Sequence, residues 1–211
     1  MRLKQTIPFI ALLLVCSVIL ASQFDLQPKI PPGYEPVDAK TEKGIWMELQ
    51  EYEKEIQRSA LLVKDEHVND YVQNVACRVA GDYCNDIRIY VIRNPNFNAS
   101  MTANGIMQIW TGLLMRVSTE DELAAIIGHE LAHYTQLHTL ERAHNIIENM
   151  GAASIVDFGL VLLTGVYAPV GQLAAVLSVL AFSREQEEEA DLLGVKFIAA
   201  SGYDPSAAVR V

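Results

Sequence analysis

The segment His129-Glu130-Leu131-Ala132-His133 constrains the fold of this 211-residue chain more than any other feature. On a helix, residues four positions apart lie on one face about a turn from each other, so both imidazoles can bind one metal ion. Glu130 follows the first histidine and can reach a water on that ion as a general base. A structural zinc site has no use for such a base, so the motif favours a catalytic zinc over a structural one.

The residues before the motif indicate that it lies on a helix. Thr119 and Glu122 have the spacing of a capping box, which predicts a helix start at this point. Apolar residues then continue at helical spacing through Leu123, Ile126, Ile127 and Leu131. A surface helix with two solvated histidines is the alternative, but it leaves this apolar face unexplained.

Two histidines leave zinc one protein ligand short, and the third is usually another His or a carboxylate. A nearby third His would require Gly at 136 and His at 139, where this chain has Gln136 and Thr139. His138 is one residue off and lies five residues from His133, a spacing that turns it away from the ligand face. The third ligand is therefore expected to be a carboxylate from residues 185–191.

Within residues 185–191, Glu187 and Asp191 are four apart and share a helix face. We predict that Glu187 binds the metal and that Asp191 accepts a hydrogen bond from the free ring nitrogen of a ligand histidine. Glu185 and Glu188 remain alternative ligands. Taken alone, Glu188 and Glu189 are better explained as part of a solvated acidic helix face.

The remaining patterns predict an α+β fold that is mainly helical, with a small sheet beside the motif helix. Helical spacing of apolar residues covers 45–62, 66–80 and 185–200, and strands are expected at 87–92 and 106–110. We predict one domain over residues 44–211, preceded by a Pro-rich linker or strap over 23–43.

The first 22 residues have the pattern of a secretory signal peptide, with Arg2 and Lys4 before an apolar run over residues 7–21. Cleavage near Ala21 is favoured over a permanent anchor because a transmembrane helix needs about 20 apolar residues. Lipidation at Cys16 is disfavoured because Val15 stands where a small residue is expected. We therefore expect an exported protein.

Export affects the interpretation of the cysteines. Without Cys16, the pair Cys77 and Cys84 remains, an even number in a compartment where disulfides persist. We predict a disulfide between them. Two buried thiols are the alternative if the chain stays in a reducing compartment.

Charge and hydropathy limit the partners. A net charge of −10 and a pI near 4.9 exclude nucleic acid, because there is no basic surface to release counterions from phosphates. Residues 158–183 carry no charged side chain before Arg184. A single membrane crossing there would separate His133 from Glu187. We therefore expect a helical hairpin that is buried in the protein or contacts the membrane surface.

Several motifs together resemble the HtpX and CAAX prenyl protease family of gluzincin zinc peptidases. They are the HELAH helix, Phe182-Ser183-Arg184, the pattern Glu187-x-Glu189-Ala190-Asp191, and Gly202-Tyr203-Asp204-Pro205. The resemblance extends from about Ile45 to the last residue. It is strongest to the BepA- and LoiP-like exported quality-control peptidases and weaker to the mitochondrial Oma peptidases.

The resemblance implies a zincin-like metallopeptidase domain with one zinc ion on His129, His133 and Glu187. Glu130 would be the base and Asp191 the hydrogen-bond partner of a ligand. An extended polypeptide would add as a further strand to an edge strand of the sheet. That edge strand would consist of Ile106, Met107, Gln108, Ile109 and Trp110.

The expected substrates are misfolded or envelope proteins, and the expected location is the periplasm or the outer side of a membrane. The alternative is a chaperone-like protein derived from a protease, with a closed zinc site. Family members continue past the position of Val211 into helices with a His, Tyr or Arg at the oxyanion. The domain is therefore expected to be shortened or incomplete, and no residue is assigned to that role.

Overall fold

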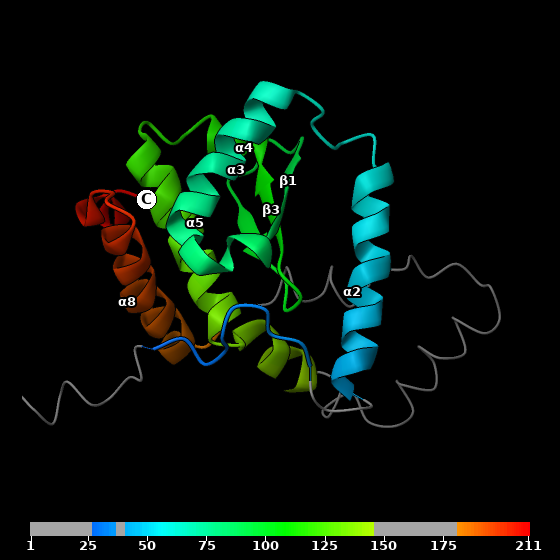
Figure 1. The fold of residues 1–211 in the computed structure, drawn as a ribbon. Helices are drawn as coiled ribbons and strands as arrows, with labels where there is room; N and C mark the ends of the chain where they lie inside the picture. The colour runs from blue at the N-terminus through cyan, green and yellow to red at the C-terminus, as the bar shows by residue number, and fades with distance from the viewer. Residues whose placement is uncertain (1–26, 37–40, 146–180) are drawn as a thin grey trace, which may run out of the picture.

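The computed structural model describes residues 27–36, 41–145 and 181–211 (Figure 1). The predicted signal peptide, residues 23–26 and 37–40 of the predicted linker, and most of the uncharged segment, at 158–180, lie outside the described residues. The elements in chain order are α2 (Thr41–Arg58), α3 (Glu66–Ala80), η1 (Gly81–Asn85), β1 (Arg88–Ile92), β2 (Ala99–Met101), β3 (Ile106–Trp110), α4 (Thr111–Leu114), α5 (Glu120–Thr135), α8 (Arg184–Ala200) and η2 (Pro205–Val209). The protein is mainly helical with one small sheet, as predicted.

The three strands form a sheet in the order β1-β3-β2. β1 pairs with β3 in parallel, and β2 pairs with β3 antiparallel. The prediction that Ile106–Trp110 is the edge strand is therefore wrong, because β3 has a strand on each side and its backbone groups are already paired. β2 was not predicted, since three residues are too few to show an alternating pattern.

The two outer strands differ in how far their edges are covered. Beyond β1, residues 61–63 cross the edge, where Val63 N–H donates to Val91 and Arg93 N–H donates to Leu61. Backbone pairing between β2 and β3 includes Thr102 N–H to Ile106 and Trp110 N–H to Asn98. Hydrogen-bonding residues alternate along an antiparallel strand, so the backbone groups of Ala99 and Met101 face away from β3. The Met101 carbonyl accepts from the Thr139 hydroxyl at 3.1 Å, so β2 is the open edge of the sheet at Ala99.

Alternation along the strands also separates the two faces of the sheet. Met107 and Ile109 of β3 belong to the main core, which they share with α3 and α5. Ile106 packs instead against Ile56 of α2, and the Gln108 amide donates to the Tyr52 hydroxyl at 2.7 Å. Figure 1 shows the same arrangement, with α2 on one side of the sheet and α3, α5 and α8 on the other.

Helix α5 begins as the sequence predicts and ends in a sharp turn. The Thr119 hydroxyl accepts the backbone N–H of Glu122 at 3.2 Å, whereas the Glu122 carboxylate accepts from Ser118 at 2.7 Å. At its other end, Leu137 has a φ of 59°, a left-handed conformation that a continuous helix does not contain. A new helix follows over residues 138–145. This turn redirects every side chain after Thr135.

Residues 27–36 lie on the domain as a strap, in agreement with one of the two predicted alternatives. Ile30 is only 2% exposed, and its carbonyl accepts from the Tyr83 hydroxyl at 2.6 Å. The strap also pairs with the end of α5, where Lys29 N–H donates to the Thr135 carbonyl at 3.0 Å. Near it, Cys77 and Cys84 form a disulfide with Cα atoms 4.6 Å apart, which ties α3 to η1.

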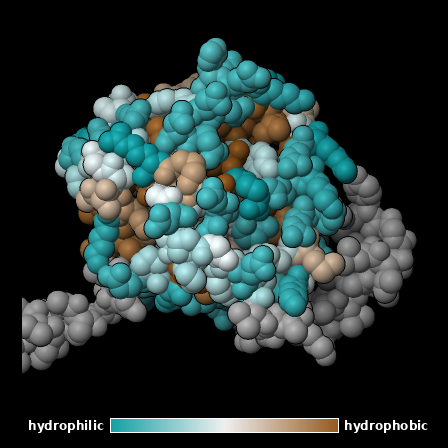
Figure 2. All heavy atoms as spheres, viewed as in Figure 1, coloured by the Kyte–Doolittle hydropathy of each residue, from teal (hydrophilic) through white to brown (hydrophobic). Residues whose placement is uncertain are grey.

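The face of the molecule shown in Figure 2 is largely hydrophilic, and hydrophobic residues emerge between polar ones. Within the ranges described, no helix combines the length and hydrophobicity required to cross a membrane.

Candidate metal centre

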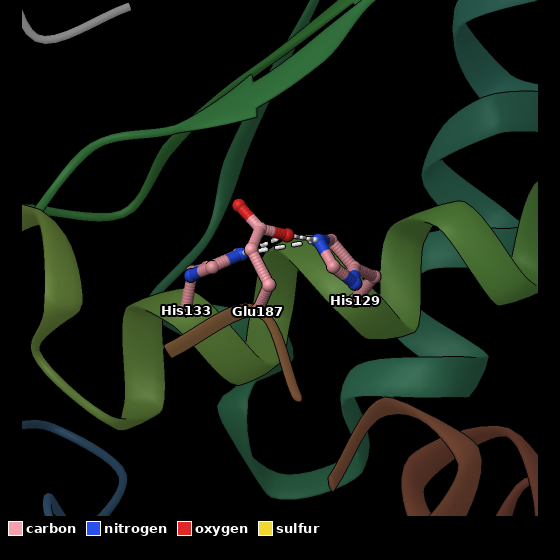
Figure 3. A group of neighbouring side chains, drawn as sticks. All are labelled: His129, His133 and Glu187. Carbon is pink, nitrogen blue, oxygen red and sulfur yellow. Dashed lines mark hydrogen bonds and ion pairs between the residues drawn. The ribbon is translucent and has the colours of Figure 1, made fainter. Parts of the chain in front are cut away.

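The two histidines of the HELAH segment face each other on α5, and Glu187 of α8 lies opposite them (Figure 3). The Nε2 atoms of His129 and His133 are 3.0 Å apart. Glu187 Oε2 lies 3.4 Å from the first of these nitrogens and 3.8 Å from the second. Two nitrogens from α5 and one oxygen from α8, more than fifty positions further along the chain, thus point to a common position.

Hydrogen bonding on the far side of His129 orients its ring. Nδ1 of His129 lies 2.9 Å from Asp191 Oδ1. An ionised carboxylate only accepts, so Nδ1 carries the proton and the Nε2 lone pair is directed at His133 and Glu187. Two imidazole nitrogens and one carboxylate oxygen are the ligand set of many catalytic zinc sites. The residues therefore fit a divalent metal ion, and the three ligand atoms lie within 4.8 Å of one another.

His133 is almost completely enclosed, at 1% exposure. Burial, followed by repulsion from His129, His138 and Arg142, lowers the pKa of His133 from 6.5 to about 2. Its ring stacks on Phe182 with centroids 3.8 Å apart, and the Arg142 guanidinium lies 3.8 Å over the Phe182 ring. His133 is therefore neutral at physiological pH, as a metal ligand must be.

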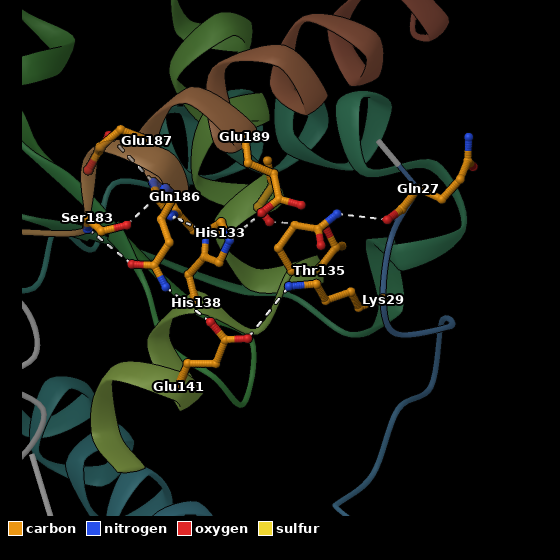
Figure 4. Close-up of polar contacts among 12 residues, drawn as sticks. Gln27, Lys29, His133, Thr135, His138, Glu141, Ser183, Gln186, Glu187 and Glu189 are labelled. Atoms are coloured by element: carbon orange, nitrogen blue, oxygen red, sulfur yellow. Dashed lines mark hydrogen bonds and ion pairs between the residues drawn. The ribbon is translucent and has the colours of Figure 1, made fainter. Parts of the chain in front are cut away.

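A second pair of side chains lies behind His133 (Figure 4). Nδ1 of His133 is 3.0 Å from Nδ1 of His138, and Nε2 of His138 is 3.1 Å from Glu189 Oε2. His138 lies outside the group of potential metal ligands among the described residues, as expected, but the left-handed turn at Leu137 brings its ring against the far side of His133. One expectation is corrected here. Glu189 does not lie on a solvated face, since its side chain is 14% exposed.

Glu130 lies beside the ligand group and next to the open edge of the sheet. Burial is the main cause of the raised pKa of Glu130. The charge of His129 lowers this pKa, and the charge of Glu187 raises it further. A backbone hydrogen bond from Met101 of β2 lowers it. A carboxylate with a raised pKa is better matched to proton transfer near neutral pH than an ordinary one. Its position connects the centre to β2.

A pocket of about 460 Å³ opens beside the ligand group. Its wall includes Ala99 of β2, His129, Glu130, Leu113, Ile126 and Val195. Polar groups that can carry chemistry therefore border a recess with an apolar floor, which is the usual composition of a binding site.

The alternative ligands lie elsewhere. Glu185 and Glu188 are exposed on α8, and neither belongs to the group of potential metal ligands among the described residues. The sequence did not reveal the contributions of β2, Phe182 or the His138–Glu189 pair. Each depends on contacts between segments that are far apart in the chain, and spacing within one segment carries no signal for them.

Comparison with known proteins places the chain in a family of peptidases. The sequence model of peptidase family M48 matches residues 63–211. The beta-barrel assembly-enhancing protease of Yersinia pestis is 29% identical over 168 residues, which cover 74% of this chain and 34% of the relative. The mitochondrial metalloendopeptidase OMA1 of Schizosaccharomyces pombe is 33% identical over 150 residues, covering 65% of this chain and 41% of the relative.

The assembly-enhancing proteases are much longer proteins, and this chain spans about a third of their length. The family match is nevertheless extensive, since it includes α3, all three strands, α5 and α8. It confirms the resemblance that the HELAH helix and the acidic segment on α8 indicated. The chain belongs to peptidase family M48.

Proposed function

We propose that this protein is a zinc-dependent metalloendopeptidase that hydrolyses peptide bonds in misfolded or envelope proteins. The observation that carries the proposal is the convergence of His129, His133 and Glu187 beside a half-buried Glu130. The names of the relatives, a beta-barrel assembly-enhancing protease and a metalloendopeptidase, support the same reaction class.

One zinc ion would be held by His129, His133 and Glu187. When bound, zinc polarises a carbonyl and lowers the pKa of a water ligand to about 7. The pocket beside these residues supports an accessible centre rather than the closed site of a chaperone-like protein. Asp191 keeps the His129 ring in the orientation that a ligand requires.

Glu130 would transfer the protons of the reaction. Its carboxylate would take a proton from the attacking water and deliver it to the amine that leaves. The raised pKa of Glu130 favours the first step, because its carboxylate is a stronger base than an ordinary one. The hydrogen bond from Met101 holds the carboxylate toward β2, where we place the substrate.

β2 is our candidate for the strand to which an extended substrate adds. The backbone groups of Ala99 face away from β3, and Ala99 lines the pocket. The outward backbone groups of Met101 already bond to Glu130 and to the Thr139 hydroxyl. A polypeptide that pairs with Ala99 would run past Glu130 and the ligand group. This pairing needs an extended chain, which suits unfolded proteins better than compact ones.

We also propose that the protein acts outside the cytoplasm. The apolar run over residues 7–21 and the Cys77–Cys84 disulfide support export to an oxidising compartment. N-terminal sequencing of the protein from a fractionated native host would locate the cleavage site. An intact Met1 in the cytoplasmic fraction would contradict export.

Replacing Glu130 tests the function directly. We expect Glu130→Gln to bind zinc as the wild type does and to cleave an unfolded protein such as casein about 10²- to 10⁴-fold more slowly, the usual contribution of a general base. Zinc content is measured by elemental analysis and cleavage by release of peptides. Glu188→Gln, an exposed change on α8, is the control and should keep full activity.

The outcomes separate the two proposed functions. Wild-type cleavage by Glu130→Gln would rule out Glu130 as the base. If the zinc-loaded wild type binds casein but never cleaves it, with or without a chelator, the chaperone-like function is favoured instead.

A further inference from the structure

Behind His133, the side chains of His138 and Glu189 form a short chain of hydrogen bonds that ends inside the protein. We propose that His138 and Glu189 are positioning residues, which hold His133 in the one tautomer whose Nε2 can bind the metal. The inference rests on the proposed metal centre and deepens it. It assigns a role to two residues that touch neither the metal position nor the substrate position.

With Glu189 ionised and His138 neutral, the hydrogen inventory of the three side chains fixes where each proton lies. An ionised Glu189 has no proton, so Nε2 of His138, at 3.1 Å, must donate to it. A neutral His138 then has only a lone pair on Nδ1. Nδ1 of His133, at 3.0 Å, must therefore be the donor in the second hydrogen bond. With its proton on Nδ1, His133 has its lone pair on Nε2, the atom that faces His129 and Glu187.

The other proton placements fail at the contact between the two Nδ1 atoms. A proton on both would bring two hydrogens together across 3.0 Å. A proton on neither would leave two buried lone pairs facing each other, with no metal position between them as there is between the two Nε2 atoms. A proton on Nε2 of His133 would point at the metal position and block it. The chain of contacts thus excludes the tautomer that cannot bind metal.

The two ligand histidines need different devices because their surroundings differ. The partner of His129 is Asp191, whose side chain is 72% exposed, so solvent also reaches that hydrogen bond. His133 and His138 are each 1% exposed. Without water as a substitute partner, the buried ring depends on protein groups to place its proton.

The fold supplies this pair through two features. The left-handed Leu137 ends α5 and turns His138 back toward it, and the Thr139 hydroxyl anchors the next helix on the Met101 carbonyl at 3.1 Å. Glu189 lies two residues beyond Glu187 on α8. One helix therefore delivers both the proposed third ligand and the acceptor that orients the second.

Zinc affinity tests the proposal on the full chain. We expect Glu189→Leu and His138→Phe to bind zinc about 10- to 100-fold more weakly than the wild type, the usual effect of losing such a partner. Competition with a chromophoric chelator gives the affinity. Glu188→Leu makes the same change on the adjacent, exposed residue and should bind as the wild type does. Glu189→Gln keeps an oxygen that can accept from His138 and should recover most of the affinity.

A spectroscopic measurement separates orientation from general support of the fold. Nitrogen-15 chemical shifts of the histidine rings in the metal-free wild type report which nitrogen carries the proton, and we expect Nδ1 for His133. This measurement needs no variant to fold. In Glu189→Leu the proton should be shared between both nitrogens. A proton on Nε2 of His133 in the wild type would overturn the proposal, and so would wild-type zinc affinity in both Glu189→Leu and His138→Phe.

Failure here is distinguishable from failure of the metal centre. If Glu187→Ala loses zinc while Glu189→Leu and His138→Phe keep it, the centre stands and the positioning role is wrong. If Glu187→Ala keeps full zinc occupancy, the proposed ligand set itself is wrong.

Discussion

At the scale of single residues, the centre shows how equivalent positions in a motif receive unequal surroundings. His129 and His133 would bind the same ion, but the His129 ring is partly exposed and the His133 ring is enclosed. Each Nδ1 has its own partner, Asp191 for one and His138 for the other. The common point of both Nε2 atoms is thus defined from two independent directions.

Removing the proposed third ligand should release the metal. We expect Glu187→Ala to bind zinc at least about 100-fold more weakly, since even a lost hydrogen-bond partner of a ligand costs 10- to 100-fold. Equilibrium dialysis followed by elemental analysis measures the affinity. Glu185→Ala, two residues earlier and exposed, should bind zinc normally. If Glu185→Ala loses its zinc instead, Glu185 is favoured as the third ligand.

His133 should make the metal-free protein sensitive to acid. Its folded pKa of about 2 lies below the ordinary 6.5, so the unfolded chain takes up a proton that the native chain does not. The stability from a neutral His133 is complete above pH 6.5 and is lost as the pH falls toward 2, at about 1.4 kcal/mol per pH unit.

Urea unfolding of the metal-free protein between about pH 5.5 and 4.5 measures this loss. His133→Gln should show a shallower decrease in unfolding free energy, smaller by about 1 kcal/mol over that unit, because carboxylate contributions are common to both proteins. Equal slopes would show that His133 is already protonated in the native state.

These residues also mark what local sequence can predict. Helical spacing paired His129 with His133 and Glu187 with Asp191 on shared faces, and the structure brings these four side chains together. The contact of His138 with Glu189 spans 51 positions and depends on a left-handed turn at a leucine, a residue that rarely adopts this conformation. No pattern within either segment predicts it.

At the scale of elements, two glycines let α5 and α8 approach closely enough to share a metal. A Cβ atom on Gly194 would lie 2.9 Å from the His129 backbone nitrogen, and one on Gly128 would lie 2.9 Å from Ile198 Cγ2. The helices thus touch backbone to backbone beside the first ligand.

The sheet shows what sequence analysis cannot predict at the scale of elements. β3 was recognised from its composition, but its partners were not, because strand order is a property of the whole fold.

Substituting Gly194 should disturb both stability and the metal centre. We expect Gly194→Ala to lower the unfolding free energy by about 1–3 kcal/mol, since the new methyl group pushes α8 away from the α5 backbone. The same shift moves Glu187 away from the histidines and weakens zinc binding. Urea unfolding and chelator competition measure the two effects.

Gly44→Ala is the matched control for this substitution. Gly44 is exposed on α2, and a Cβ atom added there would have no other atom within 4 Å among the described residues. Alanine there should stabilise the protein by about 0.5–1 kcal/mol through its helix propensity and leave zinc affinity unchanged. A stable Gly194→Ala with normal zinc binding would show that the helices have room to separate.

At the scale of the whole molecule, the proposed metal centre joins elements from the middle and the end of the chain. α5 contributes both histidines and Glu130, the proposed base, α8 contributes Glu187, and β2 borders Glu130. We propose that the domain also includes residues 44–62, upstream of the family match, because α2 packs on the sheet through Ile56 and Tyr52. The Pro-rich composition that predicted a linker gave no sign that Ile30 is part of the core.

Removing the metal should therefore weaken the fold as a whole. An ion that binds only the native state adds RT ln(1 + [L]/Kd), or about 2.7 kcal/mol when free zinc exceeds Kd 100-fold. We expect a chelator to remove this stabilisation and lower the unfolding midpoint by about 5–10 °C. The measurement is reversible thermal unfolding by circular dichroism, with the disulfide intact and zinc buffered at a known free concentration. Glu187→Ala should give one midpoint with and without zinc. A zinc-independent midpoint in the wild type would mean that the ion does not connect α5 to α8 in the native protein, and the proposed ligand set would have to be abandoned.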